Sequence, residues 1–60
     1  MYKVYVCNAR FPELVKNFIC TIEGSSDVVR EGQCFIFNDN NDRIHTVYLS
    51  THDRLTIEPQ

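Results

Sequence analysis

Apolar and polar residues alternate along most of the chain. The first such run covers Tyr2–Cys7, where Tyr2, Val4 and Val6 fall on one face. Because its residues are mostly β-branched or aromatic and repeat with a period of two, this run predicts a β-strand. Similar runs follow at residues 17–23, 33–37, 43–50 and 54–58, with a shorter extended piece at 28–29. The pattern therefore predicts a mostly β chain with about five strands.

The stretch between the first two strands follows a different period. Its apolar residues have the spacing of one face of an α-helix: Phe11, Leu14, Val15 and Phe18. Pro12 fits the first helical position, and Asn8 is a suitable cap. Only about two turns of helix are available, which depends on tertiary packing for stability. We expect one short helix or helical turn over residues 11–18.

Polar clusters mark the turns. Residues 38–42, with the sequence Asn-Asp-Asn-Asn-Asp, tolerate left-handed backbone and separate two strand-like runs, so they predict a β-hairpin. Gly32 can take a positive φ in a turn over residues 30–33. Two further turns are predicted at residues 24–27 and 50–53.

These elements predict one small domain spanning residues 1–60. The first expectation is a five-stranded antiparallel barrel-like sheet, SH3-like or OB-like, with the short helix near residues 11–18. The alternative is an open meander with that helix packed on one face. Phe35 and Phe37 share one face of their strand, and we expect this face to be the core because large aromatic side chains dominate small cores.

Several strands are apolar on both faces, which a single flat sheet cannot bury. Such a sheet either curls into a barrel or pairs with another copy or a partner. A chain of 60 residues also buries only a marginal core, which a partner, a second copy, a metal or a disulfide would stabilise further. The net charge of −2 lacks the basic excess typical of nucleic-acid binders and favours a protein or small-molecule partner.

The cysteines and the start of the chain bear on location. Cys7, Cys20 and Cys34 are odd in number and cannot all pair within one chain. Met1 is followed at once by a strand-like run, so we expect no signal peptide. No apolar run approaches the roughly 20 residues of a membrane span. The expectation is a cytoplasmic protein with three reduced thiols and no membrane contact.

Three kinds of chemical site match the sequence poorly. Residues 38–42 resemble the opening of a calcium loop, but the positions that require Gly and Glu hold Arg43 and Leu49. His45 and His52 lack the paired spacing of structural zinc ligands. A nucleophilic Cys–His pair needs a shaped pocket, for which so short a chain has little room. We expect no metal, no cofactor and no enzymatic activity.

These observations favour a small protein-interaction module. We expect an inhibitor or regulatory subunit that binds another protein, such as a host enzyme or regulatory complex. Compact chains of this kind are common among phage- or plasmid-encoded proteins that block a host enzyme. A homodimer is a further expectation. Loops on a rigid sheet often carry function, so the predicted partner site is the hairpin tip and its flanks: Asn40, Asp42, Arg43, His45 and Tyr48. The alternative is a nucleic-acid-binding small barrel, which would need the six basic residues gathered on one face: Lys3, Arg10, Lys16, Arg30, Arg43 and Arg54.

Overall fold

The computed structural model describes residues 1–24 and 28–60, which form six β-strands. The strands are β1 (Tyr2–Asn8), β2 (Lys16–Ile22), β3 (Val29–Glu31), β4 (Cys34–Asn38), β5 (Ile44–Tyr48) and β6 (Asp53–Pro59). The predicted mostly β character is confirmed. The turn predicted at residues 24–27 falls mainly on residues 25–27, which lie outside the described part of the chain. Within the described residues there is no helix of the length and apolarity that crossing a membrane requires.

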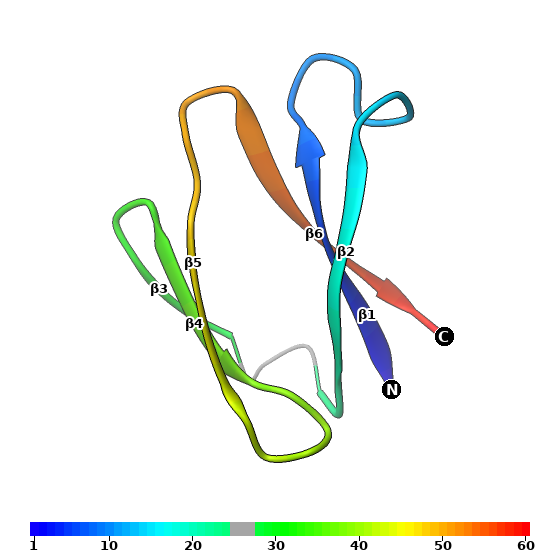
Figure 1. Ribbon diagram of the computed structural model, residues 1–60, viewed down its shortest axis with the longest axis vertical. Helices are drawn as coiled ribbons and strands as arrows, with labels where there is room; N and C mark the ends of the chain where they lie inside the picture. The colour runs from blue at the N-terminus through cyan, green and yellow to red at the C-terminus, as the bar shows by residue number, and fades with distance from the viewer. Residues whose placement is uncertain (25–27) are drawn as a thin grey trace.

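The strands form two three-stranded antiparallel sheets (Figure 1). One sheet has the order β2-β1-β6 and the other the order β3-β4-β5. In the described chain β2 forms no ladder with β3, nor β5 with β6, so the prediction of one five-stranded barrel-like sheet is wrong. Side-chain alternation predicts strands and their buried faces, but it carries no information about which strand edges pair, and this is why the closure was mispredicted.

The predicted helix over residues 11–18 is also wrong. Residues 9–15 form a loop, and β2 follows it directly. The loop contains a single turn, in which the N–H groups of Leu14 and Val15 donate to the carbonyl of Phe11 at 3.0 and 3.3 Å. The four side chains of the expected helical stripe have no core to cover and are 45–75% exposed: Phe11, Leu14, Val15 and Phe18. Without such packing a two-turn helix is not stable.

Asn8 acts as the cap of this turn. Its side-chain Oδ1 accepts the N–H groups of Arg10 and Phe11, each at 2.9 Å. Its own N–H donates to the carbonyl of Val15 at 3.0 Å. These bonds satisfy several backbone N–H and C=O groups of the loop. The chain then continues into β2, which pairs antiparallel with β1, so the single turn does not extend into a helix.

The core lies between the two sheets and is small. Its fully buried cluster contains Phe37 from β4 and Val4, Cys20 and Ile22 from β1 and β2. Partly buried apolar residues surround this cluster: Tyr2, Ile19, Val28, Phe35, Val47, Leu55 and Ile57. The expectation that the face of Phe35 and Phe37 is the core is confirmed. Phe37 is only 2% exposed and is the largest fully buried side chain among the described residues.

The hairpin predicted at residues 38–42 is confirmed, and the turn predicted at residues 30–33 lies in a second hairpin, in which β3 extends to Glu31. Between β3 and β4 the turn uses Gly32 at φ 62°, a left-handed conformation that costs glycine little. Between β4 and β5 the loop holds Asp42 at φ 62°, and Asp is among the residues that tolerate this conformation. The ends of the chain also meet, because the N–H of Gln60 donates to the carbonyl of Met1 at 3.0 Å.

The central position of Phe37 predicts a large stability loss on truncation. Phe37→Ala should lower the free energy of unfolding by about 3–5 kcal/mol, because it leaves a cavity in the cluster that joins the sheets. Phe11→Ala removes the same ring from an exposed loop position and should cost less than about 1 kcal/mol. Urea denaturation followed by far-UV circular dichroism measures both. A larger loss for Phe11→Ala than for Phe37→Ala would contradict this core assignment.

Candidate functional site at the β4–β5 hairpin

Asp39 organises the tip of the β4–β5 hairpin. Its Oδ1 accepts the backbone N–H groups of Asn41 at 2.8 Å and Arg43 at 2.9 Å. Its backbone N–H donates to the carbonyl of Arg43 at 2.9 Å, and its carbonyl accepts the N–H of Asp42 at 3.1 Å. An aspartate at the start of a turn commonly binds the backbone that follows in this way. The loop backbone is therefore held by the side chain and the backbone of one residue, Asp39.

The same carboxylate connects the tip to the core through His45. Nε2 of His45 lies 2.8 Å from Oδ2 of Asp39, and because an ionised carboxylate only accepts, Nε2 carries the hydrogen. The ring of His45 stacks on Phe37, with centroids 5.6 Å apart and an interplanar angle of 11°. The hydrogen bond from His45, followed by that from the N–H of Arg43, lowers the pKa of Asp39 below its ordinary value.

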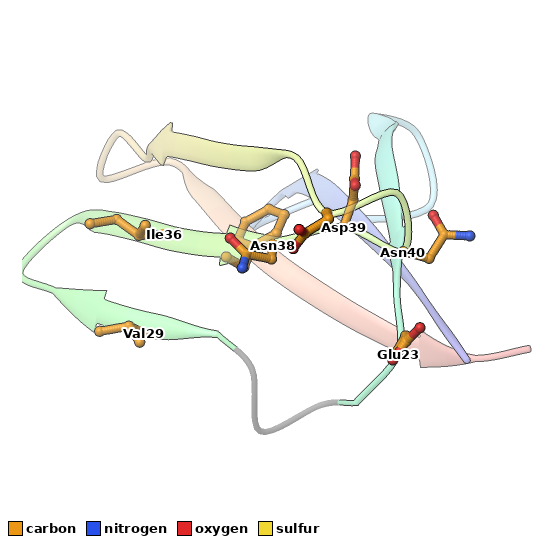
Figure 2. A pocket seen from close by; sticks show the side chains of 8 residues that line it. Glu23, Val29, Ile36, Asn38, Asp39 and Asn40 are labelled. Atoms are coloured by element: carbon orange, nitrogen blue, oxygen red, sulfur yellow. The ribbon is translucent and has the colours of Figure 1, made fainter.

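A cleft of about 600 Å³ lies beside the tip (Figure 2). Its described lining residues are Glu23, Val29, Ile36, Phe37, Asn38, Asp39, Asn40 and Asp42. Figure 2 shows Val29 and Ile36 on neighbouring strands at one end, with Glu23 and Asn40 toward the other. The described lining combines apolar side chains with three carboxylates and contains no Lys or Arg. This arrangement suits an apolar group that carries a positive charge.

The five predicted partner-site residues lie in three different settings. Asn40, Asp42 and Arg43 are exposed at the tip, and the first two line the cleft. The N–H of Asn40 also donates to the carbonyl of Thr21 at 2.8 Å, which ties the tip to the end of β2. His45 points inward and holds the loop, whereas Tyr48 is 79% exposed on the opposite face of β5. The structure thus gathers three of the five, and the partner site remains a prediction.

The face of the β3–β4–β5 sheet turned away from the core carries several apolar side chains, three of them large and exposed; we refer to it as the outer face. It carries every second residue of β4 and β5, together with the β3 residues paired to them: Val29, Glu31, Cys34, Ile36, Asn38, Ile44, Thr46 and Tyr48. Ile44 is 74% exposed and Val29 is 56% exposed. Val29 and Ile36 belong to both the outer face and the cleft, so the two form one continuous surface.

Sequence reasoning missed the two residues that define this site. Asp39 was treated only as part of a polar turn, although an Asp directly before a turn is a recognised signal for side-chain bonds to the loop backbone. The sequence pattern predicts that Ile44 lies in a strand, with no prediction that its face is exposed. Once Phe35 and Phe37 are taken as the core, the alternation places Ile44, Thr46 and Tyr48 outside, so the signal was present.

The three cysteines are free thiols, and two of them, Cys7 and Cys20, are buried in the core of the protein. Burial, followed by the negative charge of Asp39, raises the pKa of the Cys20 thiol, which favours the unreactive protonated form. In the described part of the chain no three His, Cys, Asp or Glu side chains lie close enough to hold a metal ion.

No protein-family model matches this chain, and comparisons with curated proteins and with solved structures found no match either. The function is therefore argued from the geometry of the protein itself.

The lowered pKa of Asp39 predicts a specific pH dependence of stability. Ionised Asp39 stabilises the fold above the ordinary value of 3.8, and this contribution is lost as the pH falls through its lower folded-state pKa. Asp39→Asn should therefore destabilise the protein at pH 6, and its free energy of unfolding should approach that of the wild type near pH 2. Urea denaturation at several pH values measures this.

Asp42→Asn is the matched control, because it removes one negative charge from the same loop without touching the bonds of Asp39. It keeps a side chain suited to the left-handed backbone at this position. If the difference between wild type and Asp39→Asn stays constant from pH 6 to pH 2, Asp39 does not hold the hairpin tip as described.

Proposed function

We propose that this protein is a non-catalytic protein-interaction module, an inhibitor or regulatory subunit that binds another protein through the outer face and the adjoining hairpin tip. The observation that carries this proposal is the exposure of large apolar side chains on regular, hydrogen-bonded strands. Ile44 and Tyr48, each two residues from Thr46 on β5, are 74% and 79% exposed. Contiguous exposed apolar patches with a polar rim are typical of protein-binding surfaces.

The tip supplies the polar rim of this surface. Asn40, Asp42 and Arg43 surround its end. Asp39 is bonded to the backbone of Asp42 and Arg43, and the N–H of Asn40 donates to the carbonyl of Thr21. A preordered loop loses little conformational entropy on binding, which favours affinity. The carboxylates of the cleft favour a partner that presents a basic side chain with an apolar stem at this position.

The settings of His45 and Cys20 support a non-catalytic assignment. His45 is engaged with Asp39 and stacked on Phe37, so its ring serves the fold. Cys20 belongs to the buried core. A nucleophile needs an exposed reactive atom with a base in reach, and neither residue offers this in the present arrangement.

The nucleic-acid alternative gains no specific support. Lys16 forms an ion pair with Glu58 at 2.6 Å and lies over the ring of Tyr5. Arg30 donates to the carbonyl of Gly32 at 3.0 Å. These two basic side chains already have partners within the protein, and they belong to different sheets.

The proposal predicts that outer-face substitutions abolish partner binding without unfolding the protein. Tyr48→Ala and Ile44→Ala should each weaken the affinity for the captured partner at least tenfold, as expected for anchors at the centre of an interface. Arg43→Ala, at the rim, should have a smaller effect that diminishes with added salt. Capture from the native cells followed by calorimetry with the purified partner measures these affinities.

Leu14→Ala is the control, because Leu14 is 75% exposed on the distant β1–β2 loop. It should leave the affinity unchanged. Loss of binding with Leu14→Ala but not with Tyr48→Ala or Ile44→Ala would move the partner site to the β1–β2 loop and contradict the proposal.

A further inference from the structure

β5 is an edge strand whose outward backbone groups can be identified from two hydrogen bonds. The N–H of Leu49 donates to the carbonyl of Gln33 at 2.9 Å, and the N–H of Asp39 donates to the carbonyl of Arg43 at 2.9 Å. Both pairs continue the β4–β5 register at its two ends. In an antiparallel ladder, pairs that exchange hydrogen bonds alternate with pairs that do not.

Counting in steps of two from these pairs shows, for every residue of β5, whether its backbone N–H and C=O groups point toward β4 or away from it. His45 and Val47 bond to β4, whereas Ile44, Thr46 and Tyr48 direct their N–H and C=O groups away from β4. β5 ends the strand order β3-β4-β5, and in Figure 2 it lies on the opposite side of β4 from β3. Three donors and three acceptors therefore face outward along one edge.

The other three sheet edges carry features that discourage pairing, and β5 does not. β6 contains Asp, Arg, Glu and Pro, and β3 has only three residues, two of them charged. β2 begins with a lysine, has a register shift opposite Val4 and Tyr5, and its Thr21 carbonyl is occupied by the N–H of Asn40. β5 has the sequence Ile-His-Thr-Val-Tyr, with no Asp, Glu, Lys, Arg or Pro. Edges without such protection readily pair with another strand.

We propose that β5 pairs antiparallel with β5 of a second copy, about a two-fold axis at Thr46, to form a six-stranded sheet across the dimer. In this register Ile44 lies opposite Tyr48 of the other copy and Thr46 opposite its counterpart. All three pairs are of the hydrogen-bonded kind, so the three donors and three acceptors of each copy are satisfied. Aromatic–β-branched and Thr–Thr pairs are favourable cross-strand neighbours.

The charge and the area of this contact define its strength. The paired strands bring no Lys, Arg, Asp or Glu opposite a like charge, because β5 contains none. A five-residue edge is about 17 Å long and covers less than the roughly 800 Å² per partner of a standard interface. The dimer therefore belongs to the weak class, with a Kd between about 10 μM and 1 mM.

Sedimentation equilibrium of the purified protein from 10 μM to 1 mM, with no other protein present, tests the pairing. The wild type should dimerise within this range. Thr46→Lys and Thr46→Glu each place like charges opposite one another at the axis and should raise the Kd at least tenfold. Thr51→Lys, with the same charge change in the exposed β5–β6 turn, should dimerise as the wild type does.

Mixing the two charged variants makes the test specific for the register. An equimolar mixture of Thr46→Lys and Thr46→Glu should associate more tightly than either variant alone, because only a two-fold axis at residue 46 places the opposite charges together. Amide exchange gives a second readout: the N–H groups of Ile44, Thr46 and Tyr48 should gain protection with concentration. Those of His45 and Val47 should be protected at every concentration.

A wild type that stays monomeric at 1 mM overturns the proposal. Dimerisation that Thr46→Lys does not weaken, or charged variants that do not associate when mixed, also overturns it. Because no heterologous partner is present, failure here leaves the proposed binding through the outer face untouched. Failure of the partner-capture experiment likewise leaves this self-pairing standing.

Discussion

The packing of Phe37 between the two sheets is the interaction on which the rest of the structure depends. Phe37 belongs to the β3–β4–β5 sheet, and the other buried members of its cluster belong to the β2–β1–β6 sheet. His45 stacks on its ring and reaches Asp39, which in turn fixes the hairpin loop. The conformation of the candidate site therefore derives from the core, because each contact in this series positions the next.

A core this small has a consequence for the surface. Two thin sheets bury only their facing sides, so apolar side chains on the outer face remain in water unless another molecule covers them. On β5 the outward backbone groups belong to Ile44, Thr46 and Tyr48, whose side chains are all exposed, and two of these, Ile44 and Tyr48, carry the large apolar side chains. The side chains form a surface that a partner can contact, and the backbone groups form a sheet edge with which another strand can pair. Since these are perpendicular surfaces, contact with a partner and pairing with a second copy can occur together.

The sequence predicted the elements that depend on local pattern. The period of two identified the strands, and the Asn/Asp cluster at residues 38–42 and Gly32 identified the turns, because these signals act within a few residues. The helix prediction failed at Phe11 and Leu14 because helical spacing has meaning only when another surface packs against it. Sheet closure and the role of Asp39 depend on contacts with residues outside the local pattern. The sequence pattern carries no information about these contacts. The clustering of Asn40, Asp42 and Arg43 was predictable, whereas the inward orientation of His45 required knowledge of the core face.

In the monomer Phe37 is buried, whereas Ile44 and Tyr48 are in contact with water. Solvent paramagnetic relaxation enhancement, measured by NMR on dilute protein with a soluble inert paramagnetic agent, tests this directly. The account predicts strong enhancement for the side-chain protons of Ile44 and Tyr48 and almost none for those of Phe37. Protection of Tyr48 in the dilute monomer, or strong enhancement at Phe37, would contradict it.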